Sequence, residues 1–178
     1  MSKKENKTLI RFAKRVPLDI KELYHISFRD DLEGKWVPKR PDGDYGHETD
    51  QSLLPETTDA RISLSPTIEK CFQAIYANVK HLIRKDKALN FNVYTPLFTG
   101  EEWIVYPDAL AKQKFVHDAH VTKEHCVVSP VYMKHIGKVS ITTTGDKEKL
   151  NYYAYGVKDE TGYYGWVPKN VSVKKKKR

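Results

Sequence analysis

Residues 61–84 read RISLSPTIEKCFQAIYANVKHLIR, and this stretch holds the longest helical pattern in the chain. Its first five residues, 61–65, alternate apolar and polar side chains as a half-buried strand does. Ser65 is suited to cap a helix, and Pro66 suits the first helical position, where an N–H is not needed. The stretch therefore predicts a strand over 61–65 that runs directly into a helix over 66–84. The apolar residues at helical spacing are Ile68, Cys71, Phe72, Ile75, Val79 and Leu82.

Short strand patterns lie on both sides of this helix. Before it, residues 23–28 read LYHISF and alternate large apolar with smaller polar side chains. Residues 30–59 are rich in Pro, Gly and Asp and predict a long loop. One main helix among many short strands predicts a mixed α+β domain. The strand-like segments after the helix are 91–94, 125–129, 138–142 and 102–106, of which the last also fits a helix.

Basic residues gather at the two ends of the chain. The 178 residues carry a formal net charge of +8, and the last five, 174–178, are all lysine or arginine. We predict a basic leader over 1–20, a single domain over 21–173 and a basic tail over 174–178. Such ends are usually solvated, and they can add weak, salt-sensitive affinity for nucleic acid.

The C-terminal part of the domain is rich in aromatic residues and glycine. Residues 152–173 carry three glycines between aromatic residues, which predicts an aromatic-rich β-hairpin region and a small β appendage over 142–173. The GWVP sequence at 165–168 resembles the end of an SH3-like barrel. Two interpretations stay open: a hairpin packed on the domain, or an independent SH3-like module whose Trp166 binds a proline-rich peptide.

Composition and motifs exclude several classes of protein. Hydrophobic residues make up 39% of the chain, which rules out a wholly disordered protein. No apolar run reaches the roughly 18 residues of a membrane helix, and the N-terminus lacks the apolar stretch of a signal peptide. With only two cysteines, Cys71 and Cys126, there is no disulfide framework, so we expect a reduced, cytoplasmic protein. The sequence also lacks a phosphate-binding glycine loop, a GxGxxG motif and a GxSxG motif.

The histidines raise the question of a metal site. His117, His120 and His125 lie close together in the sequence, as zinc ligands often do. The segment has neither a cysteine pair nor an HExxH pattern. We therefore predict a polar loop here, without a metal.

Three segments, in order along the chain, carry polar side chains suited to nucleotide chemistry. The first is the strand over 23–28, with a histidine and a hydroxyl two residues apart and so on the same side. The second is the strand-to-helix junction at 61–65, with a tyrosine further along the helix. The third, over 124–141, is a strand led by an acid, a turn and an aliphatic strand. The candidate residues are His25, Ser27, Ser63, Ser65, Tyr76 and Glu124.

The ordered trio resembles the ADP-ribosyltransferase superfamily, in its diphtheria-toxin-like branch with a His-Tyr-Glu motif. That family has a histidine in its first core strand, followed two positions on by a small or hydroxyl residue, as at His25 and Ser27. Its middle motif is a strand entering a helix, and its last is an acid leading a strand, as Glu124 does here. The resemblance covers roughly residues 22–142 and implies an ADP-ribosyltransferase-like mixed domain of short strands with one main helix.

The resemblance also implies a ligand and roles for the candidate residues. NAD would be the substrate, and Glu124 would be the catalytic acid that offsets the positive charge developing on the ribose as nicotinamide leaves. A basic residue would pair with the pyrophosphate, the candidates being Arg29, Lys39 and Arg40. The NAD-binding residues would be His25, Ser27, Ser63, Ser65 and Tyr76.

The chain departs from the family pattern at two places. Where the family's middle motif carries a tyrosine, this sequence has Ile62 or Ser63, so the site is atypical or degenerate unless Tyr76 takes that part. Thr122 stands two residues before the acid, where arginine-directed members have a glutamate, which argues against arginine as the acceptor.

Several functions stay open on this basis. The first is an NAD-dependent ADP-ribosyltransferase-like protein that transfers ADP-ribose to a host macromolecule, either protein or nucleic acid. The second is a non-catalytic nucleotide- or protein-binding module on a degenerate version of the same fold, such as a phage or mobile-element protein that inhibits a host factor. An RNA 2′-phosphotransferase-like activity is a related third.

Overall fold

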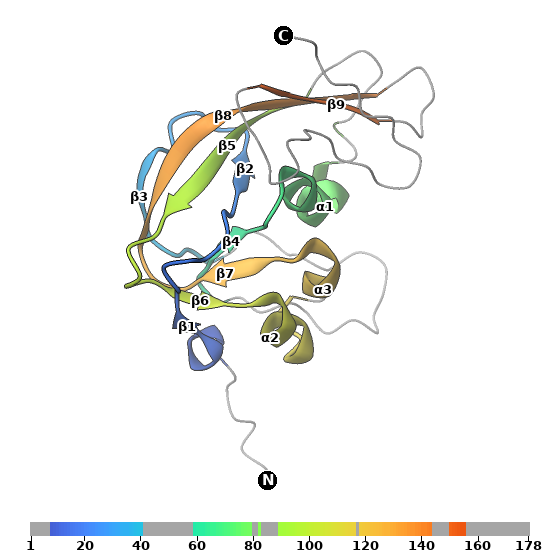
Figure 1. Ribbon diagram of the computed structural model, residues 1–178. Helices are drawn as coiled ribbons and strands as arrows, with labels where there is room; N and C mark the ends of the chain where they lie inside the picture. The colour runs from blue at the N-terminus through green and yellow to red at the C-terminus, as the bar shows by residue number, and fades with distance from the viewer. Residues whose placement is uncertain are drawn as a thin grey trace.

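The computed structural model describes residues 8–40, 59–79, 82, 89–116, 118–143 and 150–155, with the backbone alone for 76–78, 140–143 and 150–155. In this part the protein is an α+β fold of two antiparallel sheets and a few helices (Figure 1). The α+β class predicted from the sequence is therefore confirmed. None of the described helices is long and apolar enough to cross a membrane.

The smaller sheet consists of very short strands in the order β1-β6-β7-β4. Strand β7 lies in its middle, with β6 on one side and β4 on the other. The segment at 102–106 contains a strand and not a helix, and its two buried apolar residues, Ile104 and Val105, pack in different clusters on opposite faces. The bounds are β1 Lys14–Arg15, β6 Trp103–Val105, β7 His125–Val127 and β4 Ile62–Leu64.

The larger sheet is built on two long strands, β5 Leu89–Leu97 and β8 Val131–Thr143, which pair along the whole of β5. A register shift between Val93 and Tyr94 marks a bulge, which bends such a pair. Both strands curve around helix α1 in Figure 1. The shorter strands of this sheet are β2 His25–Ser27 against β5, and β3 Gly34–Trp36 and β9 Leu150–Tyr155 against β8.

Helices cover one face of both sheets. Helix α1, Ile68–Val79, packs its apolar side on the larger sheet, where Phe72 meets Phe91 with ring centroids 5.9 Å apart. The smaller sheet is covered by three short helices, whose apolar residues surround Cys126 of β7. A separate cluster, which includes Leu64, Tyr94 and Val127, joins the two sheets on their other face. The three short helices are η1 Leu9–Phe12, α2 Pro107–Lys112 and α3 Ala119–Thr122.

Two local expectations need correction. Helix α1 begins at Ile68 and not at Pro66, and its cap is Thr67, whose hydroxyl accepts a hydrogen bond from the Lys70 amide at 3.1 Å. Ser65 does not cap the helix because its backbone is paired with Tyr24 in a bridge between the sheets.

The predicted leader is in part built into the domain. Leu9 is 1% exposed in the cluster around Cys126, and strand β1 pairs with β6. Part of the predicted appendage, residues 150–155, forms strand β9 of the larger sheet. Residues 1–7, most of the predicted loop at 30–59, the helix end at 80–81 and 83–84, and residues 156–178 with the SH3-like segment lie outside the described part.

Candidate functional site

The three segments singled out in the sequence are neighbours in space. Strand β2 meets strand β4 at the bridge between Tyr24 and Ser65, whose backbones exchange hydrogen bonds of 2.8 and 2.9 Å. Strand β4 in turn pairs with β7, which places Leu64 opposite His125. Residues from three distant parts of the chain therefore lie across three adjacent strands.

The register of these strands decides which side chains share a face. Paired residues point to the same side of a sheet, and successive residues point to opposite sides. Tyr24 and Ser65 therefore lie on one face, which we call the helix face because α1 packs against it. The other face, called here the histidine face, carries His25, Leu64 and His125.

Three of the predicted site residues have side chains on the helix face. The Glu124 carboxylate lies 3.8 Å from the Cys126 thiol, inside the part of the domain covered by helices, and is 7% exposed. Ser63 pairs with Cys126, and its side chain hydrogen-bonds to that thiol. Ser65 is 2% exposed, and its side chain lies against Cys71 of α1.

Both thiols on the helix face, Cys71 and Cys126, have pKa values that burial raises. Burial raises the pKa of the Cys71 thiol to about 12; hydrogen bonds from Ser65 oppose the shift, and the negative charge of Glu124 adds to it. Burial, with the charge of Glu124, also raises the pKa of Cys126 well above its ordinary value. Both thiols therefore stay protonated at neutral pH, and neither is suited to act as a nucleophile.

Glu124 and His25 do not lie on the same face of these strands. Glu124 is next to His125 in the chain, so its side chain points away from the histidine face, as its contact with Cys126 shows. Because side chains alternate along a strand, β7 would have to shift by one residue against β4 to place Glu124 on the histidine face. Tyr76 belongs to α1, which packs on the helix face, and its side chain lies outside the described atoms.

His25 is held firmly on the histidine face. Its Nδ1 lies 2.9 Å from the backbone carbonyl oxygen of Ser63, and the Trp36 ring meets the imidazole edge to face, with ring centroids 4.9 Å apart. Burial lowers the pKa of His25, and the bond to Ser63 opposes that shift. Ser27 lies on the same face, where its hydroxyl accepts a bond from the Arg29 amide at 3.2 Å.

Further aromatic rings surround His25. Tyr94 is paired with His25 across β2 and β5, and its ring lies 5.7 Å from Trp36 and 5.2 Å from His135, between centroids. The Tyr94 hydroxyl donates to the Arg29 carbonyl at 2.8 Å, which ties the β2–β3 loop to the sheet. The Trp36 indole N–H donates to the Leu32 carbonyl and so ties the tryptophan of β3 to the same loop.

His125 lies on the histidine face, and the sequence interpretation did not include it among the candidate residues. Its Nδ1 lies 2.8 Å from the Lys123 carbonyl oxygen, and its ring meets Tyr106 edge to face at 5.4 Å. Burial lowers its pKa, with the bond to Lys123 in opposition. In the sequence His125 was considered only as a zinc ligand, and the alternation of Glu124, His125 and Cys126 does not say which residue faces inward. Only the pairing with β4 settles that.

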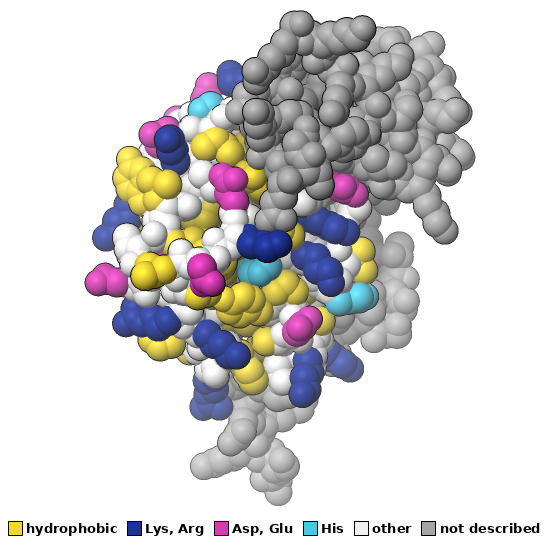
Figure 2. Space-filling model, in the orientation of Figure 1, with side chains coloured by type: hydrophobic (Ala, Val, Ile, Leu, Met, Phe, Trp, Pro, Cys, Tyr) yellow, Lys and Arg dark blue, Asp and Glu magenta, His cyan; other side chains and the backbone are white. Residues whose placement is uncertain are grey.

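The charged residues proposed for a pyrophosphate are placed differently from one another. Arg29 forms a bidentate ion pair with Asp31, in which the Nε–Oδ1 and Nη2–Oδ2 distances are both 2.9 Å. Lys39 forms a backbone bridge with Arg61. Figure 2 shows lysine and arginine side chains interspersed with acidic and apolar ones on the visible face. In the described part of the chain, no group of three or more His, Cys, Asp or Glu residues is arranged to hold a metal ion.

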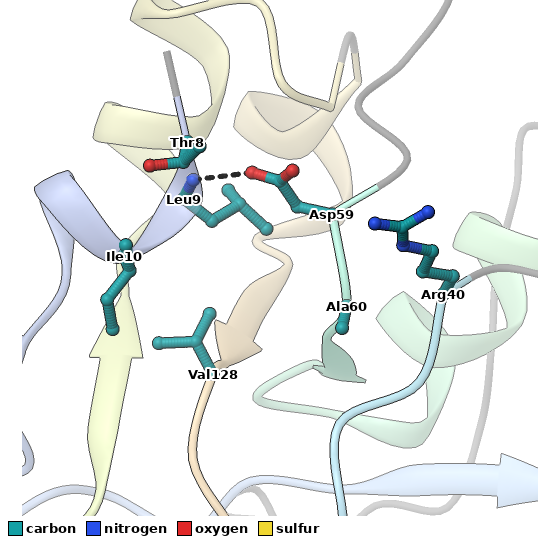
Figure 3. Close-up of a pocket in the computed structure, with 7 residues that line it drawn as sticks. All are labelled: Thr8, Leu9, Ile10, Arg40, Asp59, Ala60 and Val128. Carbon is teal, nitrogen blue, oxygen red and sulfur yellow. Dashed lines mark hydrogen bonds between the residues drawn. The ribbon is translucent and has the colours of Figure 1, made fainter. Parts of the chain in front are cut away.

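Arg40 lines a separate open pocket of about 270 Å³ (Figure 3). Asp59 lies at its edge and accepts a bond from the Leu9 amide at 2.7 Å, which holds η1 to the segment before β4. The other lining residues are Thr8, Ile10, Ala60 and Val128. Arg40 is therefore separated from the other candidates, since His25, Ser27, Ser63, Ser65 and Glu124 do not line this pocket.

Comparisons with known proteins return no match: no family model, curated protein or solved structure is similar to this chain.

Proposed function

We propose that this protein is an ADP-ribosyltransferase-like domain that binds NAD on the histidine face and transfers ADP-ribose to a macromolecule, either protein or nucleic acid. The observation that carries the proposal is the adjacency of β2, β4 and β7. The His25 strand, the strand that enters helix α1 and the strand led by Glu124 are far apart in sequence but meet side by side. A chance likeness of three separate sequence segments would not require them to be neighbours.

The chemistry of the histidine face supports a nucleotide ligand. Aromatic rings such as Trp36 and Tyr106 offer flat apolar surfaces to a base, and both are partly buried around the cluster that joins the sheets. His25 offers a ring nitrogen that can accept a hydrogen bond from a ribose hydroxyl. Small-molecule sites are commonly lined by aromatic and apolar side chains with a few polar groups, and the histidine face carries both kinds.

A second function is favoured by one specific observation. Glu124 is buried on the helix face, opposite to His25. A site without an acid beside the ribose would bind a nucleotide without breaking its glycosidic bond. The alternative is therefore a non-catalytic nucleotide- or protein-binding module on a degenerate version of the same fold.

Calorimetry on the full chain tests the proposal. We expect heat on titration with NAD and ADP-ribose, and weaker or no heat with a short RNA. His25→Ala should weaken the binding of both nucleotides, whereas His120→Ala, at an exposed histidine of α3, should leave it unchanged. Binding without release of nicotinamide would favour the binding module. The absence of heat with every nucleotide would reject an NAD function altogether.

A further inference from the structure

We infer that the open pocket beside η1 is a second ligand site of this protein and that it binds a free apolar α-amino acid. This inference goes beyond the proposed function and does not depend on it, because His25 and His125 of the histidine face do not line the pocket. Three features of the structure support it: a cavity that is open to solvent, a cation that has no partner in the described part of the chain, and a separate apolar part of the lining.

Contacts between distant parts of the chain hold the walls of the pocket. The bridge of Lys39 with Arg61, with a backbone hydrogen bond of 2.9 Å, places Arg40 beside the segment that enters β4. In that segment, the Asp59 carboxylate accepts a bond from the Leu9 amide at 2.7 Å and brings the start of η1 to the same place. The cavity of about 270 Å³ therefore lies between segments that hydrogen bonds tie together.

Arg40 is available to a ligand. Its side chain is exposed, and within the part of the chain that the structure describes its guanidinium forms no hydrogen bond or ion pair, unlike that of Arg29. In Figure 3 the guanidinium points toward the segment of Asp59 and Ala60. A guanidinium presents parallel N–H donors that match the two oxygens of a carboxylate. The pocket therefore offers a group that binds a carboxylate.

The second charge of the lining has the opposite sign. Asp59 lies at the edge of the pocket, and its carboxylate is the acidic group among the lining residues. Because the charges of Arg40 and Asp59 cancel, a phosphate with several negative charges would meet repulsion from one group as well as attraction to the other. A ligand that carries an ammonium and a carboxylate is attracted to both. A free α-amino acid has these two charges on one carbon atom at neutral pH.

The remaining part of the lining is mainly apolar. In Figure 3 Ile10 and Val128 lie on one side of the Asp59–Ala60 segment and Arg40 on the other. Ile10 is 56% exposed, so an apolar group that covers it removes apolar surface from water and stabilises the complex. The volume of about 270 Å³ lies below the range of about 300–1,000 Å³ for drug-sized ligands. A small ligand with an aliphatic side chain, such as leucine, therefore suits this pocket.

The experiment titrates the full chain with leucine and with two analogues that each lack one charge. Isocaproate is leucine without the ammonium, and isoamylamine is leucine without the carboxylate. Calorimetry measures the affinities, and the methyl NMR signals of Ile10 and Val128 locate the ligand. We expect leucine to bind about tenfold more tightly than either analogue, which is the effect of losing one hydrogen bond to a charged group. Inorganic phosphate should bind more weakly than leucine.

Substitutions test each part of the lining with a matched control. Arg40→Gln should weaken leucine binding about tenfold, whereas Lys39→Gln, which removes the same charge at the neighbouring residue outside the pocket, should weaken it less than about threefold. Asp59→Asn keeps an acceptor oxygen and should abolish the preference for leucine over isocaproate. Ile10→Ala should weaken leucine binding about threefold, and Val37→Ala, at an equally exposed valine outside the pocket, should leave it unchanged.

Several results would overturn the inference and leave the proposed NAD function standing. Isocaproate or phosphate that binds as tightly as leucine would reject an amino acid as the ligand. Unchanged leucine binding in Arg40→Gln, or an equal loss in Lys39→Gln, would reject the site, and so would the absence of any effect of leucine at millimolar concentrations. If Arg40→Gln does not fold, the wild type decides: leucine must shift the methyl signals of Ile10 and Val128 more than those of Val37.

Discussion

Tyr24 and Ser65 exchange two backbone hydrogen bonds, of 2.8 and 2.9 Å, at the point where the two sheets meet. The Tyr24 carbonyl also accepts a bond from the Cys71 thiol at 3.1 Å, so the first turn of α1 is tied to the same point. Because side chains alternate along each strand, this bridge determines to which face each neighbouring side chain points. A shift of one residue would exchange the helix face with the histidine face.

Trp36 should matter for NAD binding because its ring holds the His25 imidazole in place. An edge-to-face pair of this kind contributes about 1 kcal/mol beyond its buried area. We expect Trp36→Phe to weaken NAD binding slightly and Trp36→Ala to weaken it about tenfold. Trp103→Ala, at a tryptophan of β6 that stacks with Arg15, is the control and should bind NAD as the wild type does. Calorimetry measures both, and equal losses at the two positions would contradict the assignment.

Glu102 should stabilise the turn between β5 and β6. Its carboxylate accepts bonds from the Thr99 and Gly100 amides at 3.0 and 3.1 Å and from the Thr99 hydroxyl at 3.0 Å. Although burial acts in the opposite direction, these bonds leave the pKa of Glu102 below its ordinary value. Glu102→Gln should therefore lower the free energy of unfolding by about 1.5 kcal/mol in urea denaturation. Glu101→Gln, at the exposed neighbour, should change it by less than about 0.5 kcal/mol.

Two glycines with positive φ form a matched pair for testing backbone strain. Gly100 has φ +88° and Gly34 has φ +134°, so alanine is strained at both positions. A Cβ at Gly100 would also come within 2.9 Å of the Leu18 side chain, whereas a Cβ at Gly34 meets nothing. Gly100→Ala should cost about 1–2 kcal/mol of unfolding free energy. Adding Leu18→Ala to Gly100→Ala should restore only the part of this loss that comes from the steric contact. Full recovery of the unfolding free energy would show that the positive φ at position 100 causes no strain.

Elements with a periodic apolar pattern could be predicted from the sequence, whereas elements without one could not. Helix α1 and strand β4 have clear apolar periodicity, and both lie within the predicted segments. Strands β1 and β3 show no such alternation of apolar residues and exist because β6 and β8 offer them backbone partners. The α2 and α3 helices were missed because six and four residues make little more than one turn.

The candidate site could be predicted only in part. Within one strand, the sequence fixes that His25 and Ser27 share a side, and the structure agrees. Between strands, the shared face depends on the register at Tyr24–Ser65 and Leu64–His125, which is set by contacts distant in sequence. For this reason the sequence alone could not show which of Glu124 and His125 lies on the same face as His25.

Stability should fall as the pH is lowered below about 6.5, the pKa of an unfolded histidine. Burial lowers the pKa of both His25 and His125 in the folded chain, so the unfolded chain binds more protons in this range. Their contribution is fully present above the unfolded pKa and is lost as the pH falls through the folded pKa. We expect urea midpoints to decrease from pH 7 to pH 5. The decrease should be smaller in His25→Gln, and an unchanged slope would contradict the burial of this ring.

Glu124→Gln separates a structural acid from a catalytic one. Its charge contributes to the raised pKa values of Cys71 and Cys126, so the substitution should lower both thiol pKa values, though burial will keep them above the ordinary value. Thiol alkylation followed against pH, with Cys71→Ala and Cys126→Ala to assign the signals, measures this. On the helix face, the loss of the carboxylate should change the thermal midpoint but leave NAD affinity and nicotinamide release within about threefold. A catalytic carboxylate would behave in the opposite way, with a rate loss on the order of a hundredfold and an unchanged midpoint. That result would return Glu124 to the reacting centre and require β7 to pair with β4 in a register one residue away from the one seen here.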